Sequence, residues 1–372
     1  MDFAFTPEHE ELRQTVRRFL QDRSDEATVR RLMVTDDGFD RGTWKQLAEQ
    51  LGLTALIVPE EFGGSGLGPV ELAITLEEMG RFLFCAPYLS TAALAVTVLR
   101  EAANDAAKQE LLPAIAKGER IVALALAEAP GLWEPSDVRM KAREVGGRWT
   151  LTGEKTAVID GQTADDFLVV ARSSQGLSLF RVRAEADGLQ REPLPTLDLT
   201  RKLARVRFRK TPAEPIAAAP DVQPQLERAF LLGLVALAAE QAGGAQQCLD
   251  LSTQHAKTRW QFGRPIGSFQ AIKHRCADML VAVEFAKSAA YHAAFRAQEG
   301  DEAELPVAAR MAKAYCSDAF FQVANDTIQV HGGMGFTWEH PAHLYFKRAK
   351  SSALLFGDSV HHRDRLATLI GV

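Results

Sequence analysis

Residues 257–270 read KTRWQFGRPIGSFQ and combine residue types that a simple connector between two helices does not need. Arg259 is a planar cation that suits phosphate oxygens, and Trp260 and Phe262 supply flat apolar rings. Two glycines and a proline in the same stretch indicate a break between helical patterns. We therefore expect this break to contact something planar or anionic.

A second glycine-rich stretch, IQVHGGMGFTWEHP at residues 328–341, ends another helical pattern. Gly332 and Gly333 could simply cap the helix, because glycine adopts the left-handed conformation without strain. Capping does not explain why consecutive glycines follow Gln329 on the last turn. A backbone without side chains also permits close approach by a ligand, so this helix end is a second candidate binding surface.

Glu240 is the candidate acid–base residue. Small and apolar residues recur around it every three or four positions of a long predicted helix: Leu226, Phe230, Gly233, Leu237 and Gly244. A carboxylate buried on such a face must be paired, protonated or functional. Two interpretations are open: Glu240 forms an ion pair with a neighbouring helix, or it is a general base whose pKa is raised by burial.

Composition restricts the remaining classes of function. The chain has 372 residues, a formal net charge of −5 and 47% hydrophobic residues, so it is expected to be globular and to have no general affinity for nucleic acid. The four cysteines form no C-x-x-C pair, and neither a zinc site nor a disulfide framework is expected. Four histidines near the C-terminus lack the spacing of a zinc helix and are expected on the surface: His340, His343, His361 and His362.

The N-terminal sequence MDFAFTPEHEELRQ has no secretory signal pattern. The longest apolar run, AFLLGLVALAA, stops at Glu240, whereas a membrane span needs ~20 residues. These features, with the unpaired cysteines, predict a cytoplasmic protein that does not enter a membrane.

The succession of patterns predicts an α+β fold that is mostly α. Residues 1–118 read as an N-terminal helical domain, 119–218 as a middle β-barrel-like domain, and 219–372 as a C-terminal four-helix bundle. The clearest strand, KLARVRFRKTP at 202–212, alternates apolar residues with arginines. A single helix is expected from Gln225 towards Thr258.

Three stretches in this order resemble the acyl-CoA dehydrogenases: VPEEFGGSGLG at 58–68, RWQFGRPIGSFQAIKHRCADM at 259–279, and IQVHGGMGFTWEHP. The resemblance covers nearly the whole chain. It implies a flavoprotein oxidoreductase of fatty acid or lipid catabolism, in which FAD lies between subunits beside an acyl-CoA substrate. A glutamate removes the α-proton, the β-hydride passes to the flavin, and an electron-transfer acceptor protein takes the electrons.

The resemblance also assigns cofactor contacts and an assembly. Arg259 would meet the pyrophosphate of a neighbouring subunit's FAD, and Phe262 would pack against that cofactor. The complete implied FAD-binding set is Arg259, Phe262, Gln270, Gln329, Gly332 and Gly333, and no metal is implied. The chain would form a homodimer, a homotetramer, or a mixed tetramer with a related subunit.

Departures from the family pattern are concentrated on one side of this site. The usual catalytic glutamate precedes the glycine of a Tyr-Glu-Gly-Thr motif, where this chain has Phe356. The second family position for the base is Gly233, and Leu234 replaces the arginine that follows. Ala127 replaces the threonine of a Thr-Glu-Pro segment, and residues 157–159 replace Trp-Ile-Thr. Flavin contacts made within one subunit are thus depleted, while those made across the interface are kept.

Two functions follow. The first is an FAD-dependent acyl-CoA dehydrogenase that performs α,β-dehydrogenation of an acyl-CoA thioester with Glu240 as its base. The alternative is a non-catalytic partner subunit of a mixed tetramer that supplies the trans half of the FAD site. A third possibility, a helical scaffold that has lost FAD, is disfavoured because Arg259, Phe262 and Gln329 are retained.

Overall fold

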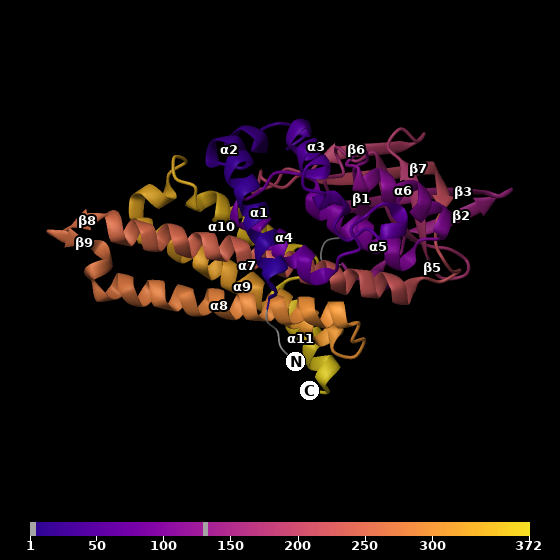
Figure 1. Cartoon of the computed structure of the whole chain (residues 1–372). Coiled ribbons are helices and arrows are strands. Elements are labelled where there is room, and N and C mark those ends of the chain that lie inside the picture. Colours follow the sequence, from indigo (N-terminus) through magenta and orange to yellow (C-terminus); the bar gives the residue numbers. More distant parts are fainter. Residues whose placement is uncertain (1–4, 129–132) are drawn as a thin grey trace. The chain divides into compact units, whose positions relative to one another are not determined.

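A computed structural model describes residues 5–128 and 133–372 (Figure 1). Helices make up the N-terminal and C-terminal regions, and all strands of the main sheet lie between Val122 and Pro215. The predicted order of helical, β and helical regions and the mostly α composition are therefore confirmed. The domain boundaries proposed after residues 118 and 218 stay a prediction.

The N-terminal region consists of short helices. Thr6 caps the first of them, because its side chain accepts a hydrogen bond from the backbone N–H of His9 and Pro7 follows directly. One segment, η3, is a π-helix in which all eight residues are buried. The elements are α1 (Pro7–Arg23), α2 (Glu26–Met33), α3 (Arg41–Glu49), η1 (Leu53–Ala55), η2 (Glu60–Phe62), α4 (Pro69–Arg81), η3 (Tyr88–Ala95), α5 (Val96–Ala102) and α6 (Asp105–Ala116).

The middle region is a mostly antiparallel sheet that closes on itself, as the barrel-like prediction requires. Successive pairings run β2–β3–β7–β5–β4, and a short parallel pairing of β4 with β2 closes the ring. β1 pairs in parallel with β4, and β6 pairs with β7. The elements are β1 (Val122–Ala125), η4 (Pro135–Asp137), β2 (Lys141–Val145), β3 (Arg148–Ile159), β4 (Asp166–Arg172), β5 (Leu177–Arg183), β6 (Leu189–Pro193) and β7 (Leu203–Pro215).

The C-terminal region is built around three long helices, and α9 contacts α8, α10 and α11. The single helix predicted from Gln225 is α7 (Gln223–Thr258). The remaining elements are β8 (Trp260–Gln261), β9 (Arg264–Pro265), η5 (Ile266–Ser268), α8 (Gln270–Glu299), α9 (Leu305–His331), η6 (Gly332–Phe336), α10 (Ala342–Leu354) and α11 (Ser359–Ile370). None of the described helices combines the length and hydropathy that a membrane crossing requires.

Contacts group the chain into two compact units. The first, the bundle unit, comprises Met1–Arg30, Pro69–Phe84 and Leu234–Val372. The second, the barrel unit, comprises Arg31–Gly68 and Cys85–Gly233, and in it η3 packs against β1.

Within the bundle unit, α4 and α7 touch backbone to backbone. A Cβ at Gly80 would collide with the carbonyl oxygen of Glu240, and a Cβ at Gly243 would collide with the carbonyl oxygen of Glu77. Each helix therefore presents a glycine to a carbonyl of the other, an approach that only glycine permits.

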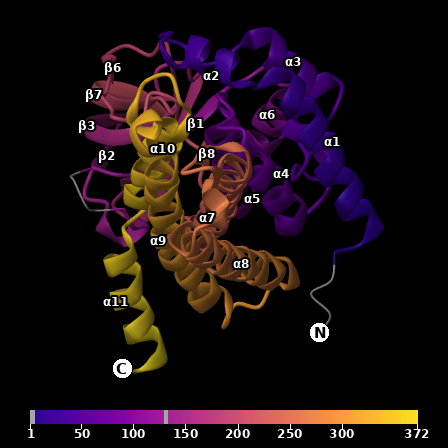
Figure 2. The same ribbon diagram turned by 90° about the vertical axis from the view of Figure 1, so that its left-hand side faces the viewer.

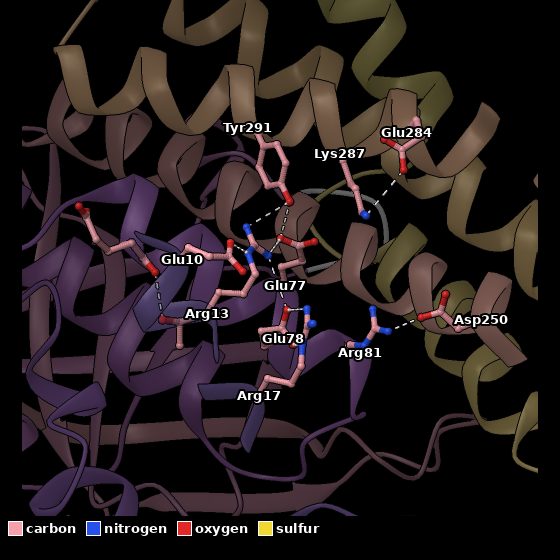
Figure 3. A network of polar contacts seen from close by, with 12 residues as sticks. Glu10, Arg13, Arg17, Glu77, Glu78, Arg81, Asp250, Glu284, Lys287 and Tyr291 are labelled. Atoms are coloured by element: carbon pink, nitrogen blue, oxygen red, sulfur yellow. Dashed lines mark hydrogen bonds and ion pairs between the residues drawn. The ribbon is translucent and has the colours of Figure 1, made fainter. Parts of the chain in front are cut away.

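Buried charges beside this contact are matched by arginines from α1. Arg13 pairs with Glu77, whose carboxylate also accepts a hydrogen bond from the hydroxyl of Tyr291 at 2.6 Å. Arg17 makes two hydrogen bonds, of 2.9 and 2.7 Å, to the carboxylate of Glu78 (Figure 3). Since an unpaired buried charge is costly, these pairs fix α1 and α8 against α4.

The glycine contact predicts that Gly243→Ala lowers the free energy of unfolding by roughly 1–3 kcal/mol or more, because the added Cβ must push α7 from α4. Gly233→Ala is the matched control, since it lies on the same helix and its Cβ would meet only the flexible end of Leu94 at 2.8 Å. Urea unfolding of both variants measures the effect. A Gly243→Ala protein as stable as the wild type would show that the helices can separate at no cost.

Candidate functional site

The break at residues 257–270 folds into a two-residue hairpin at the end of α7. Trp260 pairs with Pro265 and Gln261 with Arg264, so the turn consists of Phe262 and Gly263. Both turn residues have positive φ, 54° for Phe262 and 73° for Gly263, as in a type I′ turn.

Phe262 is strained and exposed in this hairpin. A bulky residue is disfavoured at positive φ, and turns of this type prefer Asn or Gly. Its ring is nevertheless 88% exposed, so burial in this chain does not repay the strain. Backbone strain that persists beside an exposed aromatic ring is an indication of function, and here it supports the predicted contact with a partner molecule.

The second candidate surface lies at the end of α9. Gln329, Gly332 and Gly333 are exposed, and nothing lies within 4 Å of a Cβ built on either glycine. Gly332 has φ 62°, which ends the helix. Gln270, the first residue of α8, is also exposed. The polar groups and open backbone of this set remain accessible to a ligand.

Contacts between histidine rings place the hairpin after α7 beside the glycines at the end of α9, within the bundle unit. The ring of His255 at the end of α7 lies 4.3 Å from that of His331 at the end of α9, and His331 lies 4.1 Å from His340. The ends of α7 and α9 therefore meet at one end of the bundle, which faces the viewer in Figure 2. Burial lowers the pKa of His340 to about 4, and this ring is neutral at pH 7.

Neither usual base position offers a carboxylate. Phe356 is buried, and its φ of 60° places it in a tight turn between α10 and α11. Gly233, in the barrel unit, faces the side chain of Leu94. The two departures from the family pattern thus lie at well-packed positions.

Glu240 is bound in an ion pair. Its side chain and that of Arg348 are 6% and 4% exposed, and Arg348 Nη1 donates to Glu240 Oε1 at 2.6 Å. The structure therefore supplies the partner that the ion-pair interpretation of Glu240 requires, which is Arg348. Proton abstraction by this carboxylate would require it to give up its contact with the buried arginine.

Sequence reasoning missed Lys313, which is fully buried on α9. Its amine donates to Ser317 Oγ at 2.9 Å and to the carbonyl oxygens of Ala353 and Gly357 at 3.1 and 2.9 Å, so it holds both ends of the Phe356 turn. Burial lowers the pKa of Lys313 to about 7. The available signal was a lysine in an otherwise apolar helical stretch, MAKAYC.

The expectation of four surface histidines was wrong for two of them. His343 and His362 are buried, and His362 Nε2 lies 2.9 Å from the carbonyl oxygen of Phe356. Burial lowers the pKa of His362 to about 3, so the neutral ring donates to that carbonyl and stabilises the same turn.

In the barrel unit, the segment that replaces Thr-Glu-Pro makes hydrogen bonds within the chain through Glu128. Residues 129–132 of this segment lie outside the described part of the chain. The carboxylate of Glu128 accepts two hydrogen bonds, one from the amine of Lys155 at 2.8 Å and one from the backbone N–H of Met140 at 2.8 Å. Ala157, in the stretch that replaces Trp-Ile-Thr, has φ 49° at an irregularity of β3. Alanine at both Ala127 and Ala157 leaves no side-chain hydrogen-bonding group or large ring for a flavin.

Comparisons with known proteins agree with the resemblance. Residues 6–119 match the family acyl-CoA dehydrogenase, N-terminal domain, and residues 223–370 match acyl-CoA dehydrogenase, C-terminal domain. Acyl-CoA dehydrogenase IpdE2 of Mycobacterium tuberculosis is 36% identical over 348 residues, which are 94% of this chain and 92% of that relative.

Two similar solved structures carry two protein names each. The ChsE4-ChsE5 complex from Mycobacterium tuberculosis superimposes with a TM-score of 0.91 at 28% identity, over 100% of this chain and 99% of that chain. A variant of the Tcur3481-Tcur3483 steroid ACAD has a TM-score of 0.87 at 30% identity, over 98% of both chains.

The ion pair predicts that Glu240→Gln lowers the free energy of unfolding by about 3–5 kcal/mol, because Arg348 would keep a buried charge without its carboxylate. Replacing both residues with methionine should restore most of that stability. Denaturant unfolding of these two variants, and of Glu240→Met and Arg348→Met to complete the double-mutant cycle, measures the effect. A Glu240→Gln protein as stable as the wild type would show that the pair contributes nothing.

Lys313 predicts a pH dependence of stability. The folded state lowers its pKa from 10.5 to about 7, so between these values the unfolded state binds the extra proton and stability rises with pH. Relative to Lys313→Met, the wild-type free energy of unfolding should rise by up to about 1.4 kcal/mol per pH unit in this window. Parallel pH profiles of the two proteins, measured by urea unfolding, would contradict a depressed pKa.

Proposed function

Because the chain belongs to the acyl-CoA dehydrogenase family, we propose that this oxidoreductase is the partner subunit of a mixed acyl-CoA dehydrogenase assembly. In this role it supplies the trans half of an FAD site to a related subunit that carries the catalytic base. The assembly performs FAD-dependent α,β-dehydrogenation of an acyl-CoA thioester.

The proposal rests on the residues found at the three candidate positions for a catalytic base. Phe356 and Gly233 occupy the two positions that hold a glutamate elsewhere in the family. Glu240 is the one carboxylate that the sequence suggested in their place, and its oxygen is bound to Arg348. Proton abstraction requires a base within reach of the substrate, so the base must come from another subunit.

The residues at the bundle end fit the trans side of a dinucleotide. Arg259 is an exposed cation with no carboxylate partner among the described residues, and a guanidinium matches phosphate oxygens. Phe262 offers an exposed ring, and Gly332 and Gly333 offer open backbone beside Gln329. FAD, when bound, supplies the hydride acceptor of the reaction.

The similar solved structures support a mixed assembly and suggest its substrate. Each is named as a pair of proteins, and one of the pairs is named a steroid ACAD. We extend both properties to this chain as proposals: a heteromeric assembly, and an acyl-CoA thioester whose acyl group is polycyclic. An electron-transfer protein would then reoxidise the flavin, as the family resemblance implies.

A self-sufficient dehydrogenase with Glu240 as base is the competing function. It would require Glu240 to leave Arg348 and abandon a buried guanidinium. That separation costs several kcal/mol on the scale known for buried ion pairs. The partner-subunit function needs no such rearrangement.

Anaerobic flavin reduction tests the proposal. The purified chain with added FAD and a panel of acyl-CoA esters, polycyclic ones included, should leave the visible flavin band unchanged. Assembly with a base-bearing acyl-CoA dehydrogenase should produce bleaching on addition of substrate. Bleaching by the chain alone would establish the self-sufficient enzyme instead.

Phe262→Asn separates trans contact from folding in the same assembly. Asn-Gly is favoured in a type I′ turn, so the variant should melt at or above the wild-type temperature. It should nevertheless lose FAD faster during dialysis of the assembled protein, because the exposed ring is gone. Unchanged FAD retention would show that Phe262 does not contact the cofactor.

A further inference from the structure

A long cationic segment surrounds the hairpin. Residues 251–277 contain no Asp or Glu but include five Lys and Arg side chains. Arg275 is paired with Asp326 at 3.0 Å. The other four have no carboxylate partner in the part of the chain that the structure describes: Lys257, Arg259, Arg264 and Lys273. One arginine at a cofactor pyrophosphate does not account for this charge.

The strand register places Arg264 on the same face as Arg259. Gln261 and Arg264 are directly opposed, and opposed residues of an antiparallel pair point to the same side. The N–H of Ile266 donates to the carbonyl oxygen of Arg259 at 2.8 Å, which extends the pairing by one step. Alternation along the strand then puts Arg259 on the face of Gln261 and Arg264.

This arrangement suits a doubly charged ligand. Arg259 and Arg264 are diagonal neighbours, and such positions lie roughly 7–8 Å apart in an antiparallel pair. Both side chains are long enough to converge on one group from that separation. Trp260 and Pro265 lie on the opposite face of the hairpin.

Arg264 contacts the ring of one phenylalanine, Phe269. Its guanidinium carbon lies 4.0 Å from the ring centroid of Phe269, within the range of a cation–π contact. The ring of Phe269 in turn meets the edge of Phe262 at 6.0 Å between centroids. A cation–π contact restrains the guanidinium but uses none of its N–H groups in hydrogen bonds, so these groups remain available to a ligand.

We propose that Arg259 and Arg264 form a two-arginine clamp for the diphosphate of FAD, and that Phe269 positions the second arginine. This inference deepens the proposed function and rests on it, because the trans surface must meet FAD. The adenosine diphosphate part of coenzyme A carries the same chemistry, so the experiment must separate the two ligands.

Titration of the flavin-free assembly of this chain and a base-bearing acyl-CoA dehydrogenase with FAD, ADP and coenzyme A tests the clamp. Isothermal calorimetry and quenching of tryptophan fluorescence give the dissociation constants. We expect Arg264→Ala to weaken FAD and ADP binding at least about tenfold, the change that loss of a charge-assisted hydrogen bond produces. Arg259→Ala should do the same, while coenzyme A binding should not change.

Three further variants make the measurement specific. Arg264→Lys keeps the charge but not the planar fork and should bind with intermediate affinity. Phe269→Leu should weaken binding less than Arg264→Ala, because the arginine remains but loses its support. Lys273→Ala is the control: it removes an equally unpartnered cation of the same segment from α8 and should change the dissociation constants by less than about twofold. Circular dichroism confirms the fold of each variant.

The possible failures are distinguishable. If Arg259→Ala weakens binding and Arg264→Ala does not, the clamp is wrong while the proposed function stands. A loss with Arg264→Ala that is confined to coenzyme A would also overturn the assignment to FAD. If the chain and a base-bearing acyl-CoA dehydrogenase form no assembly that binds FAD, both the clamp and the trans-site function are wrong.

Discussion

The contact between α4 and α7 in the bundle unit constrains the rest of that unit. Gly80 of α4 lies against a backbone carbonyl of α7, and Gly243 of α7 lies against a backbone carbonyl of α4. The two backbones therefore pack without side chains between them. Such close packing leaves the longer neighbouring side chains no room in the interface itself. Glu77 and Glu78 on α4 and Glu240 on α7 are therefore buried at its margins and need partners.

Those partners come from helices on different sides of the pair. α1 supplies Arg13 and Arg17, and α10 supplies Arg348. An ion pair of this kind adds little net stability compared with an apolar pair, but removing one member is expensive. The charges thus specify how α1 and α10 dock onto α4 and α7. In the proposed function Glu240 is not the base, and its carboxylate holds α10 through Arg348.

The candidate cofactor-binding surface differs from this buried region, because its polar and aromatic groups are exposed. At the C-terminal end of α7, the hairpin exposes an aromatic ring and two arginines. The backbone of Phe262 is strained and its ring is open to solvent, and Arg259 and Arg264 have no carboxylate partner among the residues that the structure describes. The proposed role, a subunit that completes another subunit's active site, rests on these exposed groups and on the missing glutamates at Phe356 and Gly233.

The sequence by itself determined the order of the elements and the residues of the exposed surface. Helical and strand periodicity depend on local geometry, so α7 and β7 could be recognised from spacing alone. Arg259, Phe262 and the glycines stood out because their residue types suit a ligand better than a turn. The hairpin strain at Phe262 was not visible, since φ follows from the pairing of Gln261 with Arg264.

Only the tertiary structure decided what the buried polar residues do. The sequence left Glu240 open between base and ion pair, because its partner, Arg348, is 108 residues away. Lys313 was missed for the same reason: its carbonyl acceptors lie beyond the end of α10. Two histidines expected on the surface are buried. The energy of a buried charge depends on which groups surround it in space, and that information is absent from local sequence spacing.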